Sequence, residues 1–227
     1  MNKRSLLLSI LIVITAAVVL VTVRQKPASA PSTTSSGDAV KSSVEAEKTV
    51  TAPPSEHVRG NVESKVTFVE YADFQCPACG AYFPILNDVE NKYKDTVKFQ
   101  FRNYPLTQIH ENGMNSAVAA EAAGMQGKFW EMHNELYKNQ SEWSTLKNPY
   151  PVFEQYALKI GINAIQFKAD YDNEKTKAVV QADMAEGKKL GIDSTPTIVI
   201  NGSIVGSNPT SVDGFSELID AALAAQN

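Results

Sequence analysis

Cys76-Pro77-Ala78-Cys79 is the stretch that decides the fold, because it lies between a short apolar run and an amphipathic helical pattern. The run before it, residues 66–71, is β-branched and aromatic, which is typical of a buried strand. After the cysteines, apolar residues recur at intervals of three and four, and this predicts a helix to about Lys94. The repeating residues are Tyr82, Phe83, Leu86, Val89 and Tyr93. The cysteines are therefore predicted where a strand ends and a helix begins.

A reversible redox pair is the leading hypothesis for these two cysteines, which are the only ones in the chain. At a helix start, free backbone N–H groups and the helix dipole favour the thiolate of Cys76. The thiolate is the form that attacks disulfides. The alternative is an inert structural clip, but a bridge between Cys76 and Cys79 closes a very short loop and removes little entropy from the unfolded chain.

The rest of the chain predicts an α/β domain with a helical insertion. A second strand is expected at residues 97–102, and Asn201-Gly202 between two short apolar runs predicts a β-hairpin at residues 197–205. A last helix follows Ser211, an expected N-cap. Between the second strand and the hairpin, five helical patterns are expected, at residues 114–125, 128–139, 151–160, 164–171 and 174–190. The order is strand, helix, strand, helical block, hairpin, helix.

The N-terminal part predicts a membrane anchor and a tether. Residues 6–23 are almost entirely apolar and just long enough to cross a bilayer, so residues 1–26 are expected to be an uncleaved anchor. Residues 27–56 have the composition of a disordered linker. The remaining residues, 57–227, suffice for one domain, with the insertion at about 107–190. The formal net charge of −4 and the lack of a basic run argue against nucleic acid as a partner.

Four motifs together resemble one family. They are Phe74-Gln75-Cys76-Pro77-Ala78-Cys79-Gly80, Tyr104-Pro105-Leu106, Gly127-Lys128-Phe129-Trp130-Glu131-Met132-His133 and Thr195-Pro196-Thr197. From about His57 to Ala224 the chain resembles DsbA-family thiol:disulfide oxidoreductases, most closely the membrane-anchored bacterial type. The resemblance implies a thioredoxin fold with an inserted all-helical subdomain.

The resemblance also implies roles for particular residues. Cys76 resembles the nucleophile and Cys79 the buried resolving cysteine. Pro196 resembles the cis-proline that faces the cysteines, and Thr195 before it would offer backbone groups to an extended substrate. Glu70 matches the buried acid that assists proton transfer at Cys79, although strand alternation alone would also allow it to face solvent. The Pro-Ala pair between the cysteines differs from the best-studied oxidases, which leaves the direction of the reaction open.

The expected activity is dithiol–disulfide exchange without a cofactor or metal, most simply donation of the Cys76–Cys79 disulfide to reduced or unfolded exported polypeptides. By resemblance, a membrane reoxidase of the DsbB or vitamin K epoxide reductase type would restore it. The expected protein is a monomer with one membrane span and an extracytoplasmic catalytic domain. The alternatives are an isomerase or reductase of the same fold, a metal-binding domain that uses both thiolates, and a non-catalytic surface domain.

Overall fold

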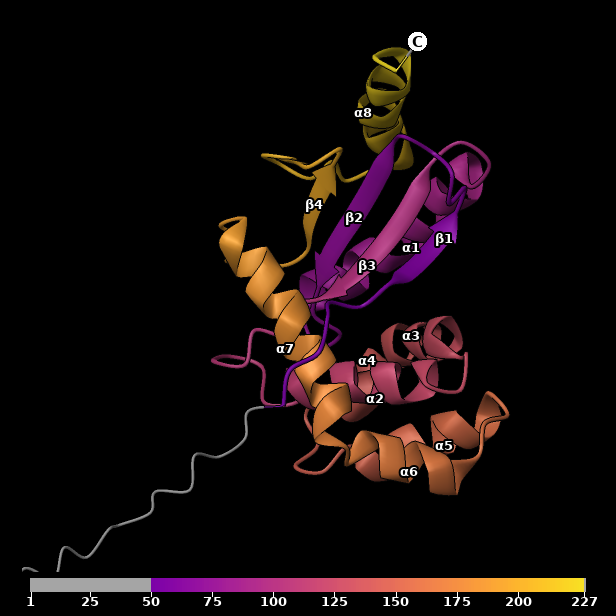
Figure 1. Ribbon diagram of the computed structural model, residues 1–227, viewed down its shortest axis with the longest axis vertical. Coiled ribbons are helices and arrows are strands. Elements are labelled where there is room, and N and C mark those ends of the chain that lie inside the picture. The colour runs from indigo at the N-terminus through magenta and orange to yellow at the C-terminus, as the bar shows by residue number, and fades with distance from the viewer. Residues whose placement is uncertain (1–49, 227) are drawn as a thin grey trace, which may run out of the picture. The chain divides into compact units, whose positions relative to one another are not determined.

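A five-stranded mixed sheet forms the centre of the computed structural model, which describes residues 50–226 (Figure 1). The strands are β1 (His57–Gly60), β2 (Thr67–Ala72), β3 (Lys98–Asn103), β4 (Thr197–Ile200) and β5 (Ser203–Ile204), in the spatial order β1-β3-β2-β4-β5. The central pair, β2 and β3, is parallel, and every other pair is antiparallel. The predicted arrangement of a parallel pair closed by a hairpin is thus confirmed.

Helices cover both faces of the sheet. On one face, α1 (Pro77–Tyr93) and α8 (Val212–Ala224) pack on alternate strand residues, such as Phe68 of β2. On the other face, α7 (Glu174–Lys189) lies against Tyr71 and Tyr104. A Cβ at Gly187 would come within 2.8 Å of the Tyr104 ring, so only glycine lets α7 approach this closely. The helix that begins at the cysteines, α1, is therefore packed against both the sheet and α8.

The helical insertion gathers at one end of the sheet (Figure 1). Its helices are α2 (Gly113–Gly124), α3 (Phe129–Lys138), α4 (Gln140–Trp143), α5 (Tyr150–Lys159) and α6 (Ala164–Tyr171). Five of the twelve residues of α2 are alanines, and this helix is buried nearly all round and lets its neighbours approach it closely. Larger side chains complete this core, among them Phe129, Met132, Leu136, Trp143, Phe153 and Phe167. The insertion thus has a core of its own, continuous with the active-site loop through Phe74.

Most predicted elements appear within about two residues of their expected bounds. In the hairpin turn, Asn201 and Gly202 both have positive φ, as a type I′ turn requires. Two elements were not predicted, the edge strand β1 and the single-turn helix α4. Each spans four residues, too few to show a period. The predicted anchor and linker lie almost wholly outside the described residues. Within residues 50–226, no helix combines the length and apolarity needed to cross a membrane.

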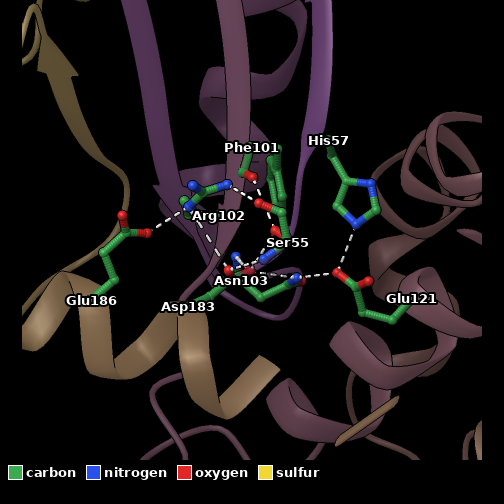
Figure 2. A network of polar contacts seen from close by, with 8 residues as sticks. All are labelled: Ser55, His57, Phe101, Arg102, Asn103, Glu121, Asp183 and Glu186. Atoms are coloured by element: carbon green, nitrogen blue, oxygen red, sulfur yellow. Dashed lines mark hydrogen bonds and ion pairs between the residues drawn. The ribbon is translucent and has the colours of Figure 1, made fainter. Parts of the chain in front are cut away.

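A buried polar network ties the segment before β1 to the sheet and to α7 (Figure 2). Its centre is Asp183, whose carboxylate is fully buried. It accepts hydrogen bonds from the Ser55 N–H and hydroxyl, both at 2.7 Å, and from the Asn103 N–H and side-chain amide at 2.9 and 3.1 Å. Arg102 joins the network by donating to Glu186 at 2.6 Å and to the Ser55 carbonyl. The domain therefore includes residues ahead of β1.

Candidate active site

The two cysteines occupy different environments at the start of α1. Cys76 is the N-cap residue, in extended backbone conformation, and Pro77 follows at the first helical position. Cys76 retains 7% of its surface exposed, whereas Cys79, one turn into the helix, has none. The Cys76 carbonyl accepts the first helical hydrogen bond, from the Gly80 N–H at 3.1 Å. Only Cys76 is therefore in a position to meet another molecule.

The chain brings Thr195 and Pro196 to the cysteines from 119 residues away. The Thr195–Pro196 peptide bond is cis, and the Thr195 carbonyl oxygen lies 3.4 Å from the Cys76 sulfur, which donates to it when protonated. Pairing of β4 with β2 begins only at Thr197, so Thr195 lies outside the ladder. The Asn208 amide donates to the Pro196 carbonyl at 2.7 Å and holds this loop in place.

The surroundings push the pKa values of the two thiols in opposite directions. A hydrogen bond from the Cys79 thiol is the largest effect that lowers the pKa of Cys76 to about 5, against the opposing effect of burial. The Thr195 side chain and the N–H groups of Ala78 and Cys79 act in the same lowering direction. The Thr195 hydroxyl is buried and makes no hydrogen bond within residues 50–226. Burial raises the pKa of Cys79 well above its usual value, and the hydrogen bond to Cys76 adds to it. At neutral pH Cys76 is therefore a thiolate and Cys79 a thiol.

Glu70 lies on the face of β2 that packs on α1, the helix that begins at the cysteines. It is partly buried beside a cavity of about 30 Å³ that Arg59, Glu90 and Tyr137 also line. Burial raises the pKa of Glu70 to about 8, while the charge of Arg59 opposes the rise. When ionised, the Glu70 carboxylate also contributes to the raised pKa of Cys79. Glu70 therefore holds a proton at neutral pH and lies close enough to Cys79 to affect its ionisation.

Replacing Glu70 with glutamine is expected to slow the steps that protonate or deprotonate Cys79 by about 100-fold, the low end for a positioned acid or base. The pH dependence of Cys76 alkylation should stay unchanged, because Glu70 is not among the groups that set it. Rapid-mixing measurements of the rate at which Cys79 resolves a preformed mixed disulfide on Cys76, the step in which Cys79 loses its proton, provide the test.

Unfolding as a function of pH supplies the control for this variant. Since the folded pKa of Glu70 is raised, the folded wild type holds a proton that the unfolded chain has lost above pH ~4.3. Wild-type stability should therefore fall as the pH rises toward 8, and E70Q should remove that part of the decline. An unchanged resolution rate together with an unchanged pH profile would show that Glu70 plays no such role.

Two polar residues before Cys76, to which the sequence assigned no role, fix the active-site loop. The buried carboxylate of Asp73 accepts from the Gln75 N–H at 2.8 Å and the Leu106 N–H at 2.8 Å, and it contacts His110 Nδ1 at 2.7 Å. The Gln75 side chain accepts from the Asn112 N–H at 2.6 Å. The only local signal was an aspartate two residues before its own N–H partner, a common turn arrangement.

Two histidines near the site have polar partners within the domain. His110 contacts the buried carboxylate of Asp73 through its Nδ1. His133 is buried among Phe74, Phe101 and other rings, and burial lowers its pKa to about 3, so it stays neutral. Across residues 50–226, no three side chains of metal-ligating type come together.

The fold and the cysteine pair define the class of thiol:disulfide oxidoreductases with DsbA-like architecture. BdbD from Bacillus subtilis, in its oxidised form, is similar at 25% identity and a TM-score of 0.66, over 78% of this chain and 98% of that one. A thioredoxin-like oxidoreductase from Silicibacter pomeroyi has 24% identity and a TM-score of 0.59, over 74% and 91% of the two chains. A sequence model of the family described as Thioredoxin matches residues 52–221. The chain belongs to this thioredoxin family.

Curated relatives of similar sequence are much longer than this chain. The Na(+)/H(+) antiporter NhaA 1 of Mycolicibacterium gilvum is 33% identical over 154 residues, which cover 66% of this chain and 24% of the antiporter. NhaA 3 of Salinispora tropica is 32% identical over 173 residues, or 76% and 26%. The chain thus spans about a quarter of the length of the curated relatives it matches, and their name describes those larger proteins.

Proposed function

We propose that this protein is a thiol oxidase that donates a Cys76–Cys79 disulfide to reduced, exported polypeptides. The observation that carries the proposal is the opposed ionisation of the two sulfurs, with the pKa of Cys76 lowered to about 5 and that of Cys79 raised. A disulfide whose reduced form contains a stabilised thiolate accepts electrons readily, because that thiolate is a good leaving group.

In the proposed reaction, a substrate thiolate attacks the Cys76 sulfur of the enzyme disulfide. A substrate–Cys76 bond forms, the Cys76–Cys79 bond breaks, and Cys79 takes a proton from Glu70. A second substrate thiolate then attacks the substrate sulfur and releases Cys76 as a thiolate. Two electrons pass from the substrate, which becomes a disulfide, to the enzyme, which becomes a dithiol. In the mixed disulfide, Thr195 would pair with the substrate backbone, since it lies outside the sheet ladder.

The proposed location is the cell membrane, with residues 6–23 as a single span and the domain on the extracytoplasmic side. The apolar composition of that stretch supports a span, and the oxidising exterior suits a disulfide donor. Reoxidation would then require a membrane partner of the DsbB or vitamin K epoxide reductase type, as in the resemblance. We propose a monomer, because the proposed oxidation uses only the two cysteines of one chain and needs no dimerisation domain.

The direction of exchange can be tested with the full chain and a protein whose activity depends on its disulfides. The oxidised chain, in stoichiometric amount, should restore activity to the reduced, unfolded substrate. It should restore little to the same substrate with scrambled disulfides. Faster recovery from the scrambled form would favour the isomerase alternative, and recovery from neither would favour a non-catalytic domain.

The rate of Cys76 alkylation by iodoacetamide is expected to rise with pH around a midpoint near 5, the pKa to which its surroundings lower it. An ordinary cysteine would show a midpoint of about 8.5. Because the folded pKa is lowered, the thiolate stabilises the reduced form at neutral pH, and this advantage should shrink as the pH falls through 5. Thermal unfolding of the reduced and oxidised chains at pH 7 and pH 4 would measure that loss. A midpoint above pH 8 would contradict the proposed oxidase.

A further inference from the structure

The side chain of Gln140 connects the helical insertion to the backbone of the nucleophile. Its amide nitrogen donates to the Phe74 carbonyl at 2.7 Å and to the Cys76 carbonyl at 2.9 Å. An amide nitrogen has two hydrogens, so one group serves both acceptors. The two carbonyls lie on either side of Gln75, within the loop that ends at the reactive sulfur. Gln140 is thus a direct contact between the insertion and the Cys76 main chain.

The short helix that carries Gln140 is firmly held. Trp143 in α4 is fully buried, and its ring N–H donates to the Leu136 carbonyl at 2.9 Å. Directly after α4, the Ser144 carbonyl accepts from the Gln75 side chain at 2.7 Å. The single-turn helix is therefore anchored both to α3 and to the active-site loop, which leaves Gln140 little freedom to withdraw.

Gly80 permits the close approach of Gln140. A Cβ at this position would lie 2.7 Å from the Gln140 side-chain oxygen, nearer than such atoms come. Gly80 follows Cys79 directly and is in the first turns of α1. The side-chain amide of Gln140 thus packs against α1: its oxygen lies next to Gly80, and its nitrogen donates to the carbonyls of Phe74 and Cys76.

This geometry has an electrostatic consequence at the sulfur. Carbonyl oxygens are the negative ends of backbone dipoles, and near a thiolate they oppose its charge. A donor bound to them offsets part of that negative potential, and it also fixes the Cys76 backbone so that the Ala78 and Cys79 N–H groups stay directed at the sulfur. We propose that Gln140 is a positioning residue for disulfide exchange, which stabilises the Cys76 thiolate by binding the carbonyls of Phe74 and Cys76.

The test compares Gln140→Leu with wild type in the full chain, by alkylation against pH and by redox equilibrium with glutathione. The loss of one interaction of ordinary strength should raise the alkylation midpoint by about one pH unit and shift the redox equilibrium about tenfold away from the reduced form. Gln126→Leu is the matched control, because Gln126 also bonds a backbone carbonyl and N–H, those of Asn163 at 3.1 and 2.9 Å, but far along the chain from the site. It should change neither reading.

Gly80→Ala provides a second variant that leaves Gln140 in place. Alanine favours helix, but its Cβ would displace the Gln140 amide, so the alkylation midpoint should rise in the same direction. The role of Gln140 rests on the thiolate chemistry proposed above, but different results would contradict the oxidase function and the role of Gln140. An ordinary alkylation midpoint in the wild type would contradict the proposed oxidase function. A low wild-type midpoint that neither variant moves, even if Q140L lowers the unfolding temperature, would overturn the role of Gln140.

Discussion

A Cys79→Ser variant is expected to lose turnover and to accumulate covalent complexes with substrate through Cys76. Serine cannot attack a mixed disulfide, so the mixed disulfide formed at Cys76 could no longer be resolved from position 79 within the same chain. Cys76 is also the sulfur whose lowered pKa makes it reactive at neutral pH. Non-reducing electrophoresis after incubation of the reduced variant with an activated peptide disulfide would reveal the adduct, and the catalysed oxidation rate should fall to the background.

The reverse variant, Cys76→Ser, is the control for this trap. Its remaining thiol, Cys79, is fully buried, and burial raises its pKa. Both effects should prevent adduct formation. Adducts of similar yield through Cys79 would contradict the assignment of nucleophile and resolving cysteine, and a Cys79→Ser chain that captured nothing would favour a structural disulfide.

The chemical centre of this site could be predicted from sequence because its signals are local. Two cysteines at a strand-to-helix transition and a Thr-Pro that opens a hairpin each have a physical reason within a few residues. The role of Glu70 was implied by the family resemblance alone, and strand alternation left the direction of its side chain open. The structure places it on the α1 side, beside Tyr137, where burial raises its pKa to about 8.

The supporting contacts could not be predicted in the same way. Gln140 meets Cys76 across 64 residues, and His110 meets Asp73 across 37, so both contacts depend on how the insertion folds back onto the loop. Neither residue lies in a pattern that distinguishes it from a surface glutamine or histidine. The strand β1 was missed for a related reason, because its four residues pair only with β3 and are mostly half-buried.

Ser55 shows the same limit at the domain boundary. The sequence placed it in the linker by composition, yet its hydroxyl and N–H both donate to Asp183, 128 residues later. A serine in a Pro- and Ser-rich stretch gives no local sign of such a contact. The contact depends on a buried carboxylate in α7 that only the folded chain brings near.

Asp183→Ala is expected to lower the free energy of unfolding of the reduced chain by about 3–5 kcal/mol, the cost of removing one partner from a buried charged network. Four donor groups, two each from Ser55 and Asn103, would lose their acceptor inside the protein (Figure 2). Arg102, 3.8 Å from the carboxylate, would lose a neighbouring negative charge. Denaturant unfolding at constant redox state measures the change.

Asp172→Ala is the matched control, because that aspartate is exposed and, within the part of the chain that the structure describes, its one ion pair is with Lys168 one turn earlier. It should change stability by less than about 0.5 kcal/mol. Since Ser55 is held by Asp183, limited proteolysis of D183A should also cut near Ser55 sooner than in wild type. A loss below about 1 kcal/mol with unchanged proteolysis would mean that water replaces the carboxylate at little cost, and that the segment before β1 is held by its other contacts.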